Sequence, residues 1–174
     1  KKRLFGNDHH AVAELAEQIA DVLIVDGVSQ YDAAVKCYME AKRIYDKVDD
    51  DINDVLSLKL KSSSIVSKLG DVYAKRGDKV KAVDFYIESL RLYQLVAGED
   101  SIESSAIYHK LGNIYHEVKL YDVSMDSFRR CLATRKMRLG DDNIEVAITL
   151  RDKGAVHESR REVDEAINCY EESF

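Results

Sequence analysis

Apolar residues recur along this chain at spacings of three and four, which is typical of helices that bury one face. Polar breaks divide the pattern into segments that are each long enough for several helical turns. We therefore expect helices over about residues 53–76, 78–97, 101–118, 121–139, 143–160 and from 163 to the end. The sequence has no proline and only 8 glycines, which suits helices and leaves little room for a sheet. The pattern predicts an all-α fold.

A second pattern repeats every 42 residues, at Gly70, Gly112 and Gly154. Each glycine follows a large residue by four positions and precedes a ring-bearing residue by three; these pairs are Val66 and Tyr73, Tyr108 and Tyr115, and Leu150 and His157. A fixed period of this size indicates one supersecondary unit that buries its core only against its neighbours. We expect each unit to be an antiparallel pair, a helix A followed by a helix B.

We place four repeats in a single array, at about residues 8–48, 51–97, 100–139 and 142–174. The first repeat matches least well and is aligned through Val12-Ala13 on Val146-Ala147. Between Tyr45 and Gly70 there are 6 extra residues, which would either lengthen a loop or extend the second helix A. Residues 1–5 align with 135–139, at the end of a helix B, and the last residue falls within another helix B. We therefore expect a fragment of a longer array.

The repeated glycines predict close contact between the two helices of a pair. Glycine within a helix costs roughly 1 kcal/mol relative to alanine, so a glycine kept at three equivalent positions needs a structural reason. We expect helix A to approach helix B at these glycines, opposite the small residues Ala82, Ser124 and Ala166. The space between the helices would be filled by Tyr73, Tyr115, Tyr86, Phe128 and Tyr170.

The helix ends also recur with the repeat. Gly98 and Gly140 follow helix B, where a residue with positive φ often ends a helix. Asp100 and Asp142 come two residues later, with a glutamate three positions further on, which predicts that these aspartates are N-caps. Asp51 and Asp54 have the same spacing before the second repeat.

The repeat pattern resembles the tetratricopeptide repeat (TPR). The 42-residue period, together with Gly140-Asp141-Asp142 followed by Val146-Ala147 and Leu150, is similar to the longer subclass found in kinesin light chains. The chain departs from the family pattern in lacking the proline common at the repeat end, and His157 replaces a tyrosine. Val66, Tyr108 and Leu150 stand where the family has tryptophan. The resemblance implies a right-handed α-solenoid of antiparallel helix pairs.

The resemblance also implies a concave groove, lined by the A helices, that takes a peptide or a partner helix. Carried onto this sequence, the candidate groove residues are Ser67, Lys68, Asp71, Lys75, His109, Asn113, His116, Arg151 and Asp152. Asn113 could pair with a peptide amide through its donor and its acceptor, and Arg151 could hold a carboxylate bidentately. The face shared by His109, Asn113 and His116 could equally be a solvated surface or, less simply, a metal site.

The charge and cysteine content narrow the choice of partner and compartment. A net charge of −6 disfavours nucleic acid and anionic membranes as partners. Cys37, Cys131 and Cys169 are odd in number and lie on helical stretches, so we interpret them as small buried residues in a reduced compartment. With neither a signal peptide nor a long apolar segment, we expect a cytoplasmic protein that does not insert into membranes.

No catalytic motif is present, and we expect no enzyme activity, no cofactor and no small-molecule substrate. The segment Asp49-x-Asp51-x-Asn53 opens like a calcium loop, but Asp54 and Leu60 replace the required glycine and glutamate, so we expect no metal. The basic residues Arg129, Arg130, Arg135, Lys136 and Arg138 are expected on an outer surface, either salt-bridged in solvent or facing an acidic partner or RNA.

The sequence therefore favours a non-catalytic adaptor that binds a protein segment in its groove. Two alternatives stay open. The array could be a structural module that associates with itself or docks on another domain of the same chain. It could also be the regulatory arm of a larger enzyme.

Overall fold

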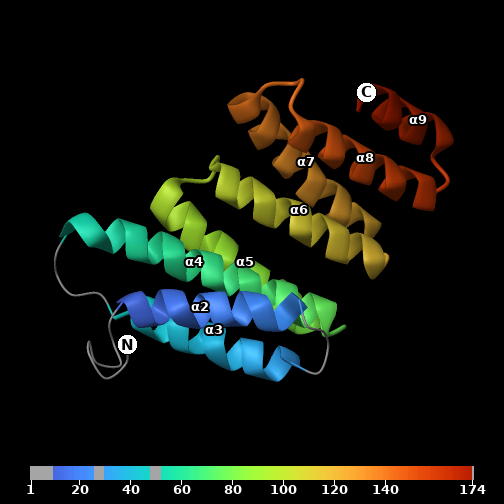
Figure 1. Cartoon of the computed structure of the whole chain (residues 1–174). Coiled ribbons are helices and arrows are strands. Elements are labelled where there is room, and N and C mark those ends of the chain that lie inside the picture. Colours follow the sequence, from blue (N-terminus) through green and yellow to red (C-terminus); the bar gives the residue numbers. More distant parts are fainter. Residues whose placement is uncertain (1–9, 26–29, 48–51, 174) are drawn as a thin grey trace. The chain divides into compact units, whose positions relative to one another are not determined.

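The computed structural model describes residues 10–25, 30–47 and 52–173, and within these residues all regular structure is helical. The chain divides into two compact units, one reaching Val96 and the other beginning at Ala97. The predicted all-α class is confirmed. The eight helices of the described residues are α2 (His10–Val25), α3 (Tyr31–Tyr45), α4 (Ile52–Lys75), α5 (Lys79–Ala97), α6 (Ile102–Glu117), α7 (Tyr121–Leu139), α8 (Ile144–Ser159) and α9 (Val163–Glu172), labelled in Figure 1.

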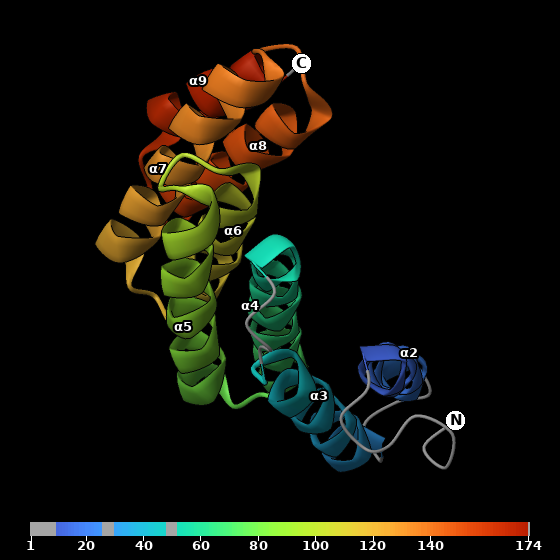
Figure 2. The same cartoon turned by 90° about the vertical axis from the view of Figure 1, so that its left-hand side faces the viewer.

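The first unit is built from α2 to α5, and each of these helices packs against the next along the chain. Its core joins three helices: Ala13 and Ala20 come from α2, Tyr38 from α3, and Ile65 and Leu69 from α4. The two alanines let α2 lie close to its neighbours, while Tyr38 fills the space between the helices. Figure 2 shows α4 and α5 side by side, joined by a short turn.

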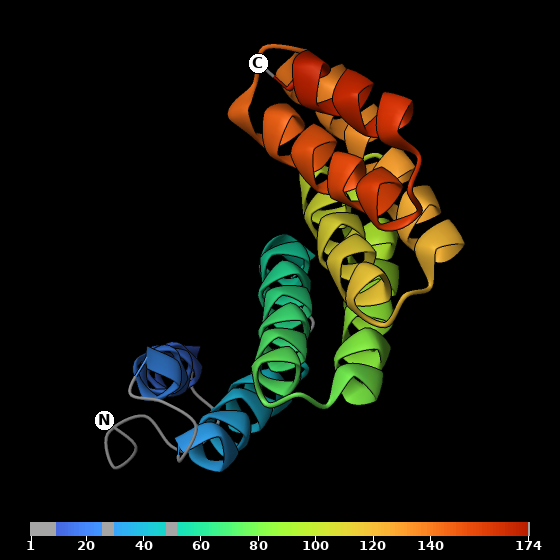
Figure 3. The same ribbon diagram turned by 90° about the vertical axis from the view of Figure 1, so that its right-hand side faces the viewer.

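The second unit is built from α6 to α9 in the same alternating manner. α7 packs against both α6 and α8, and α8 packs against α9 (Figure 3). Met125 and Phe128 of α7 form a buried cluster with Val156 of α8. Within each unit the middle helix A thus contacts its own helix B and the helix B of the repeat before it: α4 contacts α5 and α3, and α8 contacts α9 and α7.

The glycine positions are in close contact with helix B, as predicted. A Cβ on Gly70 would lie 2.5 Å from the Tyr86 ring, and one on Gly112 would lie 2.7 Å from the Phe128 ring. Gly154 has the same relationship to Tyr170, at 2.7 Å. In the second unit, the small residue opposite the glycine also contacts it, because the Ser124 hydroxyl donates a hydrogen bond of 2.7 Å to the carbonyl of Gly112. The glycines therefore make room for aromatic rings.

The predicted N-caps are wrong by one residue. Ser101 caps α6 by accepting a hydrogen bond from the Ser104 amide, and Asn143 caps α8 by accepting one from the Glu145 amide. Serine and asparagine cap as well as aspartate, so Asp100 and Asp142 are displaced into the preceding turns. The preceding glycines behave as predicted, with φ of +91° at Gly98 and +85° at Gly140. The side chains of Asp51 and Asp54 lie outside the described residues.

The 6 extra residues between Tyr45 and Gly70 lengthen a helix. α4 has 24 residues, whereas α6 and α8 each have 16. The extra residues of the second repeat therefore extend helix A at its amino-terminal end. This extension places Leu58 in a buried position, because the added turns continue to pack inside the first unit.

Candidate peptide-binding face

In the second unit, the candidate residues lie on two neighbouring A helices, α6 and α8. The His109 ring on α6 lies 2.9 Å from a carboxylate oxygen of Asp152 on α8. Two turns further along, the His116 ring lies 2.8 Å from the Ser159 hydroxyl on α8. Both pairs are separated by 43 residues, which is one repeat plus one position. These contacts join His109 to Asp152 and His116 to Ser159 across the two helices.

Both histidine rings are also held by aromatic neighbours from α7. The His109 ring meets the Phe128 ring edge-on, with 5.7 Å between ring centroids. The His116 ring lies 6.0 Å from the ring of Tyr121. Each imidazole is therefore fixed in orientation by a polar partner on α8 and an aromatic partner on α7. Such fixed side chains lose little conformational entropy if a ligand binds between them.

Asn113 lies between the two histidines on the same face of α6. Its side chain is partly buried, and within residues 10–25, 30–47 and 52–173 it makes no hydrogen bond. The amide thus keeps both its donor and its acceptor available to solvent. A side chain of this kind, with fixed neighbours on either side, is suited to pairing with the backbone of an extended peptide.

Asp152 is bonded both to His109 of α6 and to its neighbour Arg151. The Arg151 guanidinium donates hydrogen bonds of 2.9 and 3.1 Å to one oxygen of Asp152, while its side chain stays 63% exposed. Burial raises the pKa of Asp152, but hydrogen bonds from His109 and Arg151 outweigh that effect and hold the pKa below its usual range. Asp152 is therefore a fixed anion, and Arg151 is a partly compensated cation at the rim.

In the first unit, Lys68 on α4 is bonded to carboxylates of α2. Its ammonium lies 2.9 Å from Glu17 and 2.8 Å from Asp21, and it also lies over the Tyr38 ring. Burial lowers the pKa of Lys68, yet the hydrogen bonds to Asp21 and Glu17 raise it above the ordinary value overall. Burial and a hydrogen bond to Asp21 likewise raise the pKa of the Tyr38 hydroxyl.

The remaining candidates of the first unit differ in exposure. Asp71 accepts a hydrogen bond of 2.7 Å from the Tyr86 hydroxyl. Ser67 is buried, with 6% of its surface exposed, so it offers little to a ligand. Lys75 is exposed at the end of α4. The structure therefore joins Lys68 to acidic residues of α2 and Asp71 to Tyr86 of α5.

Sequence reasoning missed the partners of these residues, above all Ser159. The repeat alignment contained a signal for these partners. A residue on one helix A contacts the residue that directly follows its own equivalent on the next helix A. His109 equates with Arg151 and contacts Asp152, and Glu17 equates with Ser67 and contacts Lys68. The offset of one residue reflects how successive helices are displaced along their axes.

The predicted basic surface is wrong at one position. Arg129 and Arg130 are exposed and paired with Asp126, and Lys136 pairs with Glu172, as expected of a solvated surface. Arg135, in contrast, is only 5% exposed. Its guanidinium donates to the Glu145 carbonyl at 2.9 Å and to the Thr149 hydroxyl at 2.8 Å, so it fastens α7 to α8.

The three cysteines are free thiols, with Cys131 and Cys169 buried and Cys37 partly buried. Burial raises the pKa of the Cys131 thiol, which makes it unreactive. Across the described residues, no group of three or more His, Cys, Asp or Glu side chains could hold a metal ion. The calcium-loop-like segment 49–51 lies outside the described residues. No helix in the described part of the chain is long and apolar enough to cross a membrane.

The sequence model of the tetratricopeptide repeat matches residues 62–137 and 103–174, which is more than half of the chain. The chain belongs to the tetratricopeptide repeat family. No curated protein sequence matches it. Proteins with TPR repeats are generally non-catalytic scaffolds that mediate protein–protein interaction.

Solved structures of kinesin-light-chain type share the fold of this TPR chain. BtubC (BKLC) from P. vanneervenii aligns with a TM-score of 0.81 and 22% identity, over 94% of this chain and 61% of its own. The nearly identical TPR-like repeats of a kinesin-light-chain-type protein from Podosopora anserina align with a TM-score of 0.72 and 13% identity, over 95% of this chain and 75% of theirs. The chain thus spans less than two thirds of the BtubC structure. The expected TPR-solenoid class is confirmed.

Proposed function

We propose that the face formed by α6 and α8 binds an extended protein segment and that the protein is a non-catalytic adaptor. The observation that carries this proposal is Asn113. Its amide is available to solvent, partly buried and flanked by two histidines that α8 holds in place. One peptide unit of a ligand could receive a hydrogen bond from the Asn113 amide nitrogen and donate one to its oxygen.

Charges around Asn113 would then select the ligand. Asp152 is a fixed anion on one side of the face, and the exposed Arg151 guanidinium could exchange its bond to Asp152 for a carboxylate of the ligand. A segment with both a cationic and an anionic side chain fits this arrangement better than a uniformly charged one. These charges would fix orientation more than they raise affinity.

The polar face of α2 and α4 is a less suitable site. Lys68 is already neutralised by Glu17 and Asp21, and Lys61 is paired with Glu14 at 2.7 Å. A ligand would have to replace these ion pairs. We propose that Lys68 mainly holds the two helices together, while Lys75 contributes charge at the exposed end of α4.

We also propose a reducing, cytoplasmic setting, which the three free cysteines support. No nucleic acid or small molecule is needed for the proposed activity. The excess of acidic residues makes a protein segment the more suitable ligand.

A peptide-display selection on the whole chain tests the adaptor proposal. Selected peptides would be labelled, and their affinity for the wild type and for Asn113→Ala measured by fluorescence anisotropy. We expect Asn113→Ala to weaken binding by about tenfold or more, because it removes both hydrogen bonds to the ligand, each worth about 1 kcal/mol. Asn168→Ala is the matched control, because Asn168 is exposed on α9, and it should bind like the wild type.

Two outcomes would count against this function. One is the recovery of no specific peptide at all. The other is a set of peptides that bind Asn113→Ala as tightly as the wild type, which would move recognition away from α6. Helicity and thermal unfolding of both variants should match the wild type, since neither side chain belongs to a buried cluster.

A further inference from the structure

Two acidic side chains of α5 lie beside a pair of stacked aromatic rings in the first unit. A pocket of about 350 Å³ is lined by Tyr73 of α4 and by Lys81, Asp84, Phe85 and Glu88 of α5. The rings of Tyr73 and Phe85 stack, with 5.2 Å between the ring centroids and 12° between the ring planes. Asp84 and Glu88 are four residues apart, so they share one side of the helix. Carboxylates beside aromatic rings are surroundings in which proteins hold cations.

The two carboxylates of this pocket are only partly neutralised within the first unit. The Asp84 side chain is exposed and has no hydrogen-bond or ion-pair partner among the residues that the structure describes. Glu88 lies 3.7 Å from the ammonium of Lys42, but that ammonium lies closer, at 2.7 Å, to Asp46. The pocket therefore carries negative charge that a cation from outside the chain could neutralise.

The Tyr73 ring already attracts a cation. The ammonium of Lys81 lies over this ring, 5.2 Å from its centroid. The carboxylate paired with Lys81 is that of Asp78, at 3.2 Å. Lys81 thus marks the ring as a place that suits positive charge, while Asp84 and Glu88 keep their own charges.

The third repeat neutralises the equivalent carboxylate with an arginine of its own. One period of 42 residues takes Asp84 to Asp126 and Glu88 to Arg130. The Arg130 guanidinium donates a hydrogen bond of 3.0 Å to Asp126 and lies over the ring of Tyr108. In the second repeat Glu88 replaces this arginine. The cation that a carboxylate and an aromatic ring hold in the third repeat is therefore missing in the second.

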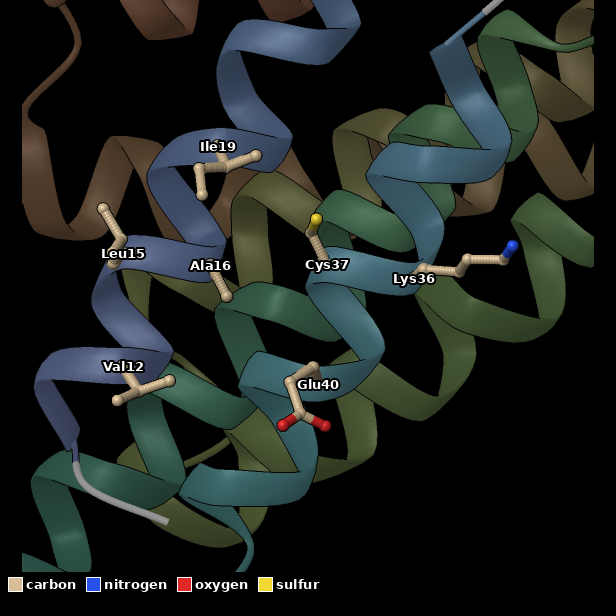
Figure 4. A pocket seen from close by; sticks show the side chains of 7 residues that line it. All are labelled: Val12, Leu15, Ala16, Ile19, Lys36, Cys37 and Glu40. Carbon is tan, nitrogen blue, oxygen red and sulfur yellow. The ribbon is translucent and has the colours of Figure 1, made fainter. Parts of the chain in front are cut away.

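The first and third repeats lack the combination of stacked rings and two carboxylates. In the first repeat, Asp84 and Phe85 equate with Lys36 and Cys37, which line the pocket between α2 and α3 shown in Figure 4. A lysine thus stands in place of the aspartate and a thiol in place of the ring. In the third repeat Ser127 replaces Phe85. The arrangement is specific to the second repeat among these three.

We propose that this pocket, the α5 pocket, binds an arginine side chain of a basic partner protein. The guanidinium would lie between Asp84 and Glu88 and beside the stacked rings. It fits better than an ammonium, because its planar fork of donors can reach two carboxylates at once. The net charge of −6 would attract such a segment. The α5 pocket lies within the first unit, so its use does not depend on peptide binding at α6 and α8.

An NMR titration of the whole, nitrogen-15-labelled chain with two peptides tests this site. The probe is acetyl-Gly-Arg-Gly-amide, and its control is the same peptide with citrulline, the neutral isostere of arginine. The arginine peptide should move the backbone amide signals around Asp84 and Glu88, whereas the citrulline peptide should not. Asp84→Asn and Glu88→Gln should each weaken binding of the arginine peptide by about tenfold, because each removes a charge-assisted hydrogen bond.

Asp126→Asn is the matched control. Asp126 is the equivalent carboxylate of the third repeat and already has Arg130 as its partner, so this variant should bind the arginine peptide like the wild type. Lys81→Gln should bind the peptide more tightly, because it removes a neighbouring cation from the α5 pocket. Circular dichroism should show that all four variants fold, since none of the substituted side chains is buried.

Several results would overturn the proposal. Equal shifts with both peptides, or none with either, would show that the α5 pocket does not recognise the charge of arginine. Unchanged affinity of Asp84→Asn and Glu88→Gln would place binding elsewhere. An equal loss in Asp126→Asn would indicate a general attraction to an acidic chain. Loss of the arginine peptide in Asn113→Ala would assign the binding to the face of α6 and α8.

Discussion

Gly112 on α6 lies against the ring of Phe128 on α7, with no room for a side chain between them. A Cβ on Gly112 would lie 2.7 Å from the nearest ring carbon, and this distance is too short for any real contact. The same relationship joins Gly70 to Tyr86 and Gly154 to Tyr170. The helix therefore tolerates glycine because the ring of helix B packs directly on its backbone.

Gly112→Ala should destabilise the protein even though alanine favours helices. Overpacking of a buried contact costs about 1–3 kcal/mol of unfolding free energy. Alanine gains roughly 1 kcal/mol over glycine in helix propensity, so the upper part of the overpacking range outweighs that gain. Urea unfolding followed by circular dichroism measures the change in unfolding free energy. Phe128→Leu should remove most of the clash, so the double variant should be more stable than the sum of the single changes predicts. Additive effects would show that the ring does not limit this position.

Arg135→Ala should be strongly destabilising. The side chain is 5% exposed, and its removal deletes its hydrogen bonds to the Glu145 carbonyl and the Thr149 hydroxyl and its ion pair with the Glu145 carboxylate. Breaking a buried charge network in this way costs about 3 kcal/mol. Arg129→Ala is the control, because Arg129 is 69% exposed and its ion pair with Asp126 is worth little. Equal losses of unfolding free energy in the two variants would show that Arg135 does not fasten α7 to α8.

Lys68→Met should weaken the contact between α2 and α4. The methionine keeps the apolar stem but loses the ion pairs to Glu17 and Asp21, so we expect a loss of about 1 kcal/mol at neutral pH. The pKa of Lys68 is raised in the folded protein. Its contribution is therefore complete below the unfolded pKa of about 10.4 and is lost as the pH rises through the folded pKa.

The control for Lys68 is Lys75→Met on the same helix. Lys75 is exposed, and no carboxylate is bonded to it among the residues that the structure describes. Urea midpoints at neutral and alkaline pH should separate the two variants. If Lys75→Met is as unstable as Lys68→Met, the loss comes from general charge balance and not from the contact with α2.

The fold could be predicted from the sequence because its strongest signals are local and repeated. Gly112 and Phe128 recur at a constant interval in equivalent forms, so the helix pairs and their contacts could be placed without coordinates. The N-caps could not, since Asp100 and Ser101 are adjacent and both suit that role. The sequence also could not decide between an extended α4 and a longer loop, because the extra residues are compatible with either.

The candidate face could be predicted only in part. The spacing of His109, Asn113 and His116 predicts that they share one helix face, and in the structure both histidines contact α8. Their partners depend on the axial displacement between successive helices, which a repeat alignment does not contain. Arg135 was misplaced for a similar reason. A charged residue in a basic segment suggests a surface, and only the packing of α7 on α8 shows that this one is buried.

Asp152 should give the second unit a specific sensitivity to acid. Its pKa is lowered in the folded protein, so its carboxylate stabilises the fold at pH values above the unfolded pKa of about 4. That stability is lost as the pH falls through the lower, folded pKa. Asp152→Asn should therefore reduce the unfolding free energy at neutral pH, and the difference from the wild type should shrink as the pH falls below about 4.

The appropriate comparison for Asp152 is Asp122→Asn. The Asp122 side chain is 92% exposed although it pairs with Arg160 at 2.8 Å, so solvent screens its charge. Urea unfolding curves at a series of pH values should show a pH-dependent difference for Asp152→Asn and almost none for Asp122→Asn. The contact between His109 and Asp152 would be unimportant if the Asp152→Asn curve ran parallel to the wild type throughout. A difference that closes only at acid pH instead requires that Asp152 is held as an anion by His109 and Arg151, which is the charge arrangement that the proposed peptide-binding face needs.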